Sequence, residues 1–142
     1  MALNWDAIRY LSIPTTEYAV VGSGVLEAHG VREAVDTEIV CTYEQYRQLA
    51  DSPGTVVKRW DNGNTCVIVP TPAGVVEVNC EASYCGGTFP GLDTILNSAE
   101  IIDGVSFISL YVMRSWKAEA ARPKDLADVA AIDAYLASRR SL

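Results

Sequence analysis

The residue types best suited to chemistry lie in two short segments near the N-terminus. Gly22-Ser23-Gly24 ends an apolar run, and twelve residues separate Ser23 from the segment Asp36-Thr37-Glu38. If the second segment is extended, Asp36 and Glu38 project from one face, about 7 Å apart along the chain. Carboxylates that share a face repel each other unless a cation lies between them. Because oxygen-only ligands favour Mg²⁺ or Mn²⁺, the pair predicts a divalent-metal site.

The Gly22-Ser23-Gly24 turn has the composition of a phosphate-binding loop. Glycines let the backbone approach a phosphate, and a helix that begins here offers unpaired N–H groups and a positive dipole end. Ser23 adds a hydroxyl. Since Mg²⁺ often shares its coordination shell with substrate phosphates, the turn and the acids together predict a nucleotide site. Taken separately, the turn is more often structural and the acid pair is more often a solvated strand end.

A third carboxylate is needed if two metal ions bind. Glu77 is the candidate, because it is the lone acid in the apolar segment Gly74-Val75-Val76-Glu77-Val78. An acid in such surroundings needs a partner or a metal. The alternative is an edge-strand acid that faces water.

The elements that must position these residues follow from apolar patterning and capping signals. Residues 17–21 read as a strand that is apolar on both faces, which is typical of a central strand in a covered sheet. Gly30 is placed to end the helix that follows the turn. Asn4 and Ser109 are expected helix N-caps, and Thr42-x-x-Gln45 resembles a capping box.

The rest of the chain predicts a mixed sheet with helices packed on it, an α/β or α+β fold. Asp61-Asn62-Gly63-Asn64 is the turn of an expected hairpin, residues 81–91 an expected loop, and 100–107 an extended segment with a turn at Asp103-Gly104. The remaining expected strands span 37–42, 55–60, 65–70 and 75–80, and the expected helices span 4–11, 25–29, 43–50, 92–99, 109–120 and 124–138. We expect one domain over 1–142, with the C-terminal helices 109–138 packed on it.

The candidate site residues resemble those of the polymerase-β-like nucleotidyltransferase superfamily. Its members have a Gly-Ser turn, a D-x-D or D-x-E pair and a third acid on a neighbouring strand. Gly22-Ser23, Asp36-x-Glu38 and Glu77 are similar to these motifs.

Two further motifs carry the resemblance beyond the acids. Gly30-Val31-Arg32 resembles the G-x-R that precedes the acidic pair in small prokaryotic members, some of them toxin–antitoxin nucleotidyltransferases. Lys117 and the segment Arg122-Pro123-Lys124-Asp125-Leu126-Ala127-Asp128 resemble the closing helices of the same members. The resemblance covers roughly residues 17–136. Glu38 stands where Asp is commoner, and Thr37 replaces the usual aliphatic residue.

The resemblance implies nucleotidyl transfer, in which an acceptor hydroxyl attacks the α-phosphorus of a nucleoside triphosphate and pyrophosphate leaves. Two Mg²⁺ ions, or Mn²⁺, would be held by Asp36, Glu38 and Glu77, and Glu77 would be the general base. The remaining implied substrate contacts are Gly22, Ser23, Gly24, Arg32, Lys117, Arg122 and Lys124.

The acceptor stays open between a tRNA end, a protein hydroxyl and a small molecule. A partner subunit or a homodimer could complete the site. The alternative function is that of a fold relative that has lost catalysis and binds a nucleotide or a partner protein; the presence of all three acids favours the enzyme.

Several of these residues also have purely structural interpretations. Arg32 could pair with Glu33 or Asp36, and Lys117, Arg122 and Lys124 could form a solvated face. Asp125 and Asp128 are expected to tie the last helix to Arg122 or Arg32. The aromatic residues Trp60, Tyr84 and Trp116 could stack on a base, but ordinary packing explains each of them.

Composition limits the class of protein and its partners. The chain has 142 residues, 49% hydrophobic and 20% charged, with net charge −7, which argues against a broad nucleic-acid surface. The charge is uneven, because residues 111–142 hold 6 Lys+Arg against 4 Asp+Glu. No apolar run suits a membrane span and no signal peptide is evident, so we expect a cytoplasmic protein. Cys41, Cys66, Cys80 and Cys85 match no zinc pattern; buried thiols are expected, with a Cys80–Cys85 disulfide as the alternative.

Overall fold

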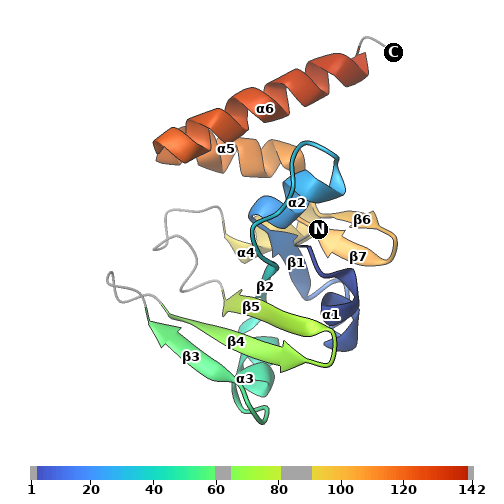
Figure 1. Cartoon of the computed structure of the whole chain (residues 1–142), viewed down its shortest axis with the longest axis vertical. Coiled ribbons are helices and arrows are strands. Elements are labelled where there is room, and N and C mark those ends of the chain that lie inside the picture. The colour runs from blue at the N-terminus through green and yellow to red at the C-terminus, as the bar shows by residue number, and fades with distance from the viewer. Residues whose placement is uncertain (1–2, 60–64, 81–90, 141–142) are drawn as a thin grey trace.

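Strand β1 (Tyr18–Val21) lies in the interior of the sheet, and all four of its residues are buried. The computed structural model describes residues 3–59, 65–80 and 91–140. Within them a seven-stranded mixed sheet has the order β3-β4-β5-β2-β1-β7-β6, with helices packed against it (Figure 1). The expected mixed sheet with packed helices, and the central position of β1, are therefore confirmed.

The other strands are short except for β4 and β5. They are β2 (Glu38–Cys41), β3 (Val56–Arg59), β4 (Thr65–Thr71), β5 (Gly74–Cys80), β6 (Glu100–Ile102) and β7 (Val105–Phe107). Strand β2 pairs antiparallel with β1 and parallel with β5, and β1 pairs parallel with β7. The pairs β3–β4, β4–β5 and β6–β7 are antiparallel.

Of the helices in the described residues, three begin directly after their predicted N-cap residues. The helices are α1 (Trp5–Tyr10), α2 (Ser23–Ala28), α3 (Tyr43–Ala50), α4 (Leu92–Asn97), α5 (Leu110–Ala120) and α6 (Pro123–Arg140). The side chains of Asn4, Thr42 and Ser109 accept hydrogen bonds from backbone N–H groups in the first turns of α1, α3 and α5. Gly30 has φ +74°, and the N–H of the next residue, Val31, reaches back to the carbonyl of Leu26, which closes α2 as predicted.

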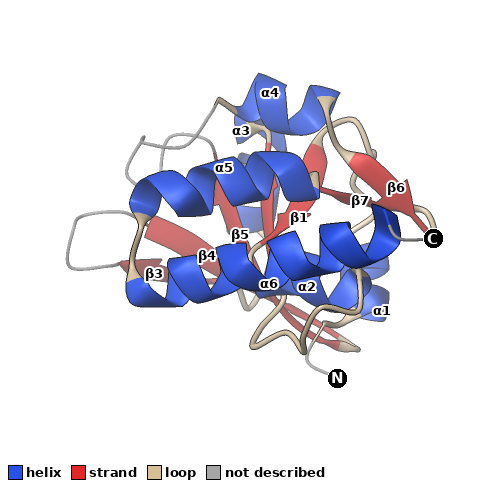
Figure 2. Ribbon diagram, turned by 90° about the horizontal axis from the view of Figure 1, so that it is seen from above, coloured by secondary structure: helices blue, strands red, loops and turns tan. Residues whose placement is uncertain are grey.

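The helices divide between the sheet and a separate pair. Helix α3 packs against β4 and β5, and α1 contacts β5 and β7. Helices α5 and α6 pack along each other, and Figure 2 shows them side by side. In Figure 1 this pair lies beside α2, whereas β3, β4 and β5 extend away from it.

Some elements differ from the sequence prediction. Residues 100–107 form two strands rather than one, but the predicted turn at Asp103-Gly104, where both residues have positive φ, is confirmed. Strand β2 begins at Glu38, so Asp36 and Thr37 precede it. The expected turn at 61–64, nearly all of the expected loop at 81–91, and Cys85 lie outside the described residues. Cys41, Cys66 and Cys80 are buried, as predicted.

We predict that Gly24→Ala destabilises the chain more than Gly30→Ala. A Cβ on the buried Gly24 would lie 2.9 Å from Leu3 Cδ1 and 3.2 Å from Val20 Cγ1, so the packed core would have to shift at a cost of about 1–3 kcal/mol. At Gly30 nothing lies within 4 Å, and only the positive φ opposes a side chain, at a cost of about 1 kcal/mol. Urea unfolding measures the free energy of unfolding of each variant. Equal losses of this free energy in the two variants would contradict the explanation of Gly24 by packing.

Candidate functional site

The parallel pairing of β2 with β5 brings two of the three predicted acids together. Glu38 and Glu77 are register partners, and the Glu77 N–H donates to the Thr37 carbonyl at 2.9 Å. Val21, the last residue of β1, is the partner of Glu38 on its other side. Because cross-strand partners share a face, Val21, Glu38 and Glu77 form one row across three strands. Glu77 lies on an interior strand, so its interpretation as an edge-strand acid is wrong.

The Gly-Ser turn lies directly beside the Glu38 carboxylate. Gly22 has φ +72°, which favours glycine, and a Cβ at this position would lie 3.0 Å from Glu38 Oε1, so a side chain here would crowd that carboxylate. The Ser23 hydroxyl accepts a hydrogen bond of 2.9 Å from the N–H of Val35. This contact ties the turn to the segment that carries Asp36. Gly24 instead packs against the core side chains of Leu3 and Val20.

The three acids interact electrostatically. Burial, followed by the nearby charges of Asp36 and Glu77, raises the pKa of Glu38 to about 7, although Lys117 and Asn79 oppose the shift. Burial and then the charge of Asp36 also raise the pKa of Glu77, while Lys58 lowers it. Burial is the larger cause of both pKa shifts and the neighbouring carboxylates add to it. A cation bound here would therefore favour the ionised forms of Glu38 and Glu77.

Asn79 is a site residue that sequence reasoning missed. Its amide Nδ2 donates to Glu38 Oε2 at 3.0 Å, and its side chain is buried two positions after Glu77 on β5. Glu77 and Asn79 alternate with buried valines, so they lie on one face of the strand. That alternation of polar with apolar residues was the available signal. Lys58 was missed as well, because its nearness to Glu77 depends on the pairing of β3, β4 and β5.

The donor set suits a hard divalent cation, but the three acids do not form a ready-made cage. Among the described residues there is no group of three or more His, Cys, Asp or Glu side chains that could hold a metal ion as placed. Asp36 is exposed in the segment before β2, whereas Glu38 is half-buried at the start of the strand. Carboxylate oxygens from Asp36, Glu38 and Glu77 are the groups that would ligate Mg²⁺.

A cleft opens beside Asp36 and Glu77. Its volume is about 330 Å³, within the range of small ligand sites. Its walls combine two acids, polar Asn4 and Thr37, and three aliphatic side chains. The lining residues are Asn4, Val35, Asp36, Thr37, Ile68, Val75 and Glu77.

The C-terminal cations are bound to carboxylates of α6 rather than arranged around the turn. Lys117, buried in α5, lies 2.9 Å from Asp128 Oδ2 and 3.5 Å from Asp125 Oδ1. Arg32 makes two hydrogen bonds to Asp128, at 3.0 and 3.1 Å, and Arg122 holds the buried Asp125.

These contacts, which we call the ion cluster (Arg32, Lys117, Arg122, Asp125 and Asp128), confirm that the two α6 acids tie the helix to Arg32 and Arg122. Burial raises the pKa of Asp125 and Asp128, but their cationic partners outweigh it and lower both.

Two further residues of the C-terminal region have separate positions. Lys124 is exposed in the first turn of α6. Trp116 is 8% exposed and packs in the core, as its structural interpretation predicted. Trp60 and Tyr84 lie outside the described residues.

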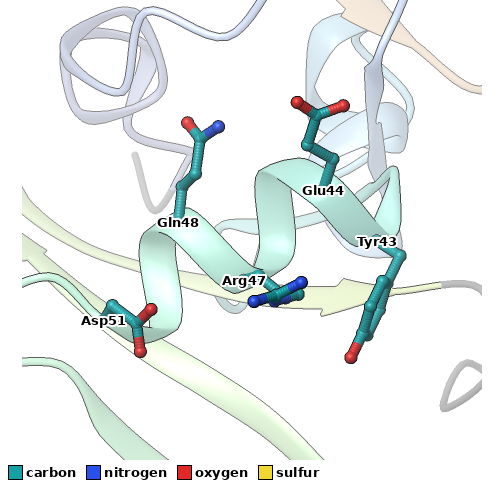
Figure 3. Close-up of a pocket in the computed structure, with 5 residues that line it drawn as sticks. All are labelled: Tyr43, Glu44, Arg47, Gln48 and Asp51. Carbon is teal, nitrogen blue, oxygen red and sulfur yellow. The ribbon is translucent and has the colours of Figure 1, made fainter.

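A second hollow lies along α3 and has no link to the acids. Figure 3 shows its lining side chains, which come from this helix and from its C-cap residue, Asp51. They are Tyr43, Glu44, Arg47, Gln48 and Asp51. Arg47 lies over the Tyr43 ring, with its guanidinium carbon 5.9 Å from the centroid. The hollow on α3 is lined by the surface of a single helix, whereas the cleft is lined by several elements and contains Asp36 and Glu77. The cleft is therefore the better candidate site.

Comparisons of the chain with protein-family models, with curated proteins and with solved structures returned no match. In the part of the chain that the structure describes, no helix is both long enough and apolar enough to cross a bilayer.

We predict that Glu38→Gln removes a pH dependence of stability between about pH 4.5 and 7. The folded chain holds the Glu38 proton up to about pH 7, whereas the unfolded carboxyl releases it near its ordinary 4.5. The unfolded state is thus favoured increasingly as pH rises through this window. Glu38→Gln should raise the free energy of unfolding at pH 7.5 by on the order of 2 kcal/mol and leave it little changed at pH 4.

The control for this experiment is Glu44→Gln, an exposed carboxylate on α3. Denaturant unfolding across pH 4–8 without divalent cations compares both variants with the parent chain. A gain from Glu38→Gln that is equally large at pH 4 would mean that the carboxylate charge is not the cause.

We predict that Asp128→Ala lowers stability by about 2 kcal/mol, because it leaves the buried Lys117 with one carboxylate and removes both Arg32 hydrogen bonds. The matched control is Asp133→Ala. Asp133 is also on α6 and also binds an arginine, Arg114, through two hydrogen bonds, but that pair is exposed and should matter little. Thermal unfolding at pH 7 tests this; similar losses in both variants would show that burial of the ion cluster is not decisive.

Proposed function

We propose that this chain is a metal-dependent nucleotidyltransferase with a polymerase-β-like fold. The supporting observation is the convergence of the Gly22 turn with Glu38 and Glu77, in which a Cβ at Gly22 would lie 3.0 Å from Glu38 Oε1 and the two acids are partners on adjacent parallel strands. A turn able to approach phosphates and an undercompensated set of carboxylates are the two halves that nucleotide transfer needs.

In this proposal Asp36, Glu38 and Glu77 hold Mg²⁺ or Mn²⁺. The metal would supply positive charge to the triphosphate and to the acceptor oxygen. Asn79 keeps the Glu38 carboxylate oriented through its 3.0 Å hydrogen bond, so that one carboxylate oxygen is already fixed. Glu77, whose pKa burial raises, is suited to accept the proton of the acceptor hydroxyl.

The nucleoside triphosphate would lie at the Gly22-Ser23 turn. Lys117 is near enough to Glu38 to lower its pKa, so it carries positive charge to this side of the site even though Asp125 and Asp128 bind it. Arg32 and Arg122 act in this proposal by fixing α6, and not by touching substrate. Lys124, exposed at the start of α6, is the remaining proposed phosphate contact.

The alternative proposal is a non-catalytic relative that binds a nucleotide or a partner protein. Two observations favour it. The three acids as placed do not form a metal-holding group within the described residues, and the main cation near the site, Lys117, is bound by two carboxylates. The enzyme would consume a nucleoside triphosphate, whereas the non-catalytic relative would bind its ligand without consuming it.

We predict that the chain releases pyrophosphate from a nucleoside triphosphate in the presence of Mg²⁺, and that Asp36→Asn reduces this at least 100-fold, because loss of one metal ligand removes transition-state charge stabilisation. The assay takes each of the four triphosphates in turn, with unfractionated cell extract as the source of acceptors.

Asp51→Asn is the control for this assay, because it removes an exposed carboxylate from the rival hollow on α3. An equal loss in Asp51→Asn would move the site to that hollow. Metal-dependent triphosphate binding without turnover would favour the non-catalytic alternative. Absence of both triphosphate binding and turnover would overturn the proposal.

A further inference from the structure

Asn4 joins the N-terminal helix to the two parts of the chain that carry the candidate acids. Its backbone N–H donates to Thr37 Oγ1 at 2.9 Å, and its side-chain Nδ2 donates to the Ala73 carbonyl at 2.6 Å. Thr37 lies between Asp36 and Glu38, and Ala73 lies in the turn that leads into β5. We call Asn4, Thr37 and Ala73 the Asn4 bridge.

The side chain at position 4 has two separate tasks. Asn4 Oδ1 accepts a hydrogen bond of 3.0 Å from the N–H of Ala7 and caps α1, while Nδ2 binds the Ala73 carbonyl. Among the residues that cap helices well, asparagine alone carries an amide N–H donor beside the capping oxygen. The turn leaves room for this amide because residue 74 is glycine; a Cβ on Gly74 would lie 2.7 Å from Nδ2. Asparagine therefore suits this position better than serine, threonine or aspartate.

Thr37 is held by the Asn4 bridge and by β5 at the same time. It is 5% exposed, its hydroxyl accepts the Asn4 N–H, and its carbonyl accepts the Glu77 N–H at 2.9 Å. A valine would have the same shape but could not accept the hydrogen bond from Asn4. This contact gives a physical reason for a threonine where the family that the sequence resembles usually has an aliphatic residue.

Asp36 lies in a segment that has no regular secondary structure. Residues 31–37 belong to neither a helix nor a strand, so no ladder of backbone hydrogen bonds fixes them. Before Asp36, the N–H of Val35 donates to Ser23 Oγ at 2.9 Å. After Asp36, the Asn4 bridge holds the chain. The exposed carboxylate of Asp36 is thus carried by backbone that is tied on both sides.

The Asn4 bridge borders the place where a cation would bind. Asn4, Asp36, Thr37 and Glu77 all line the same cleft. Carboxylate side chains can turn toward a cation, but a mobile backbone would have to be ordered on binding, at a cost in conformational entropy. Partners that orient metal ligands commonly change metal affinity by about 10–100-fold. A segment that is already ordered would bind a cation more tightly.

We propose that Asn4 and Thr37 are positioning residues, which fix the backbone of Asp36 and Glu77 so that both carboxylates can close on one divalent cation. This inference rests on the metal site of the proposed function. Asn4 and Thr37 act through the chain that carries the acids, and they do not ligate the cation themselves. The docking of α1 is in this way part of the metal site.

The test measures Mn²⁺ binding by electron paramagnetic resonance of the free ion. Thr37→Val removes the hydroxyl and keeps the shape, Thr37→Ser restores a hydroxyl, and Asn4→Ser keeps a cap for α1 but loses the amide donor. We expect the Kd for Mn²⁺ to rise about tenfold in Thr37→Val and about threefold in Asn4→Ser, whose lost hydrogen bond is exposed. Thr37→Ser should bind Mn²⁺ as the parent chain does.

Two further readouts separate positioning from a general loss of stability. Pyrophosphate release by Thr37→Val and Asn4→Ser should recover when the Mg²⁺ concentration is raised in proportion to the lost affinity, because the loaded site is unchanged. In the metal-free chain, Thr37→Val should speed hydrogen exchange at the Val35 and Glu77 amides about fivefold, and Thr37→Ser should not.

Thr42→Val is the matched control, because it removes the N-cap of α3 and Thr42 does not line the cleft. It should lower the thermal stability but leave Mn²⁺ binding and the exchange at Val35 and Glu77 unchanged. Circular dichroism verifies folding, and Asn4→Ser carries the test should Thr37→Val not fold. Parent-like Mn²⁺ affinity in the folded variants of the Asn4 bridge, or an equal loss in Thr42→Val, would overturn the positioning role.

Failure of this inference can be separated from failure of the proposed function through Asp36→Asn. If Asp36→Asn weakens Mn²⁺ binding while Thr37→Val and Asn4→Ser do not, only the positioning role is overturned. If the parent chain binds no Mn²⁺, or Asp36→Asn binds it as tightly as the parent chain, the metal site of the proposed function is overturned and this inference with it.

Discussion

The parallel pairing of β2 with β5 is the constraint on which the candidate site depends. It places Glu38 opposite Glu77, with the Gly22 turn beside Glu38 and with Asp36 close enough to raise the pKa values of both glutamates. A slip by one residue would turn Glu38 into the core and Ile39 out of it. The core prevents that slip, because Ile39 and Val78, the next pair along the two strands, are fully buried.

The carboxylates at the sheet are only partly compensated by nearby positive or hydrogen-bonding groups, whereas those on α6 are surrounded by cations. Asn79 and Lys117 oppose the charge at Glu38 but do not cancel it. At α5 and α6 the opposite arrangement holds, since in the ion cluster three cations surround Asp125 and Asp128. A partly buried cluster of this kind fixes geometry more than it adds stability. It holds the helical pair against the segment that follows α2, and so keeps Lys117 near the site.

The surroundings of the carboxylates differ between the β1 side and the β3 side of the sheet. Toward β1 lie the glycine turn and the positive charge of Lys117, where the proposed function would place the triphosphate. Toward β3 lie the aliphatic side chains of Ile68 and Val56, with Lys58 alongside.

The sequence by itself determined what depends on neighbours along the chain: the caps at Asn4, Thr42 and Ser109, the end of α2 at Gly30, and the acids as candidates for one site. Tertiary structure alone decided which partner each charge meets. Arg32 pairs with Asp128, 96 residues away, and Asn79 binds Glu38, because strand order and helix docking create those contacts. The sequence predicted that Gly24 contacts a phosphate. In the structure Leu3 packs against it and leaves little room for a side chain. Local propensity acts over a few residues, whereas charge pairing and packing act over distances that only the folded chain sets.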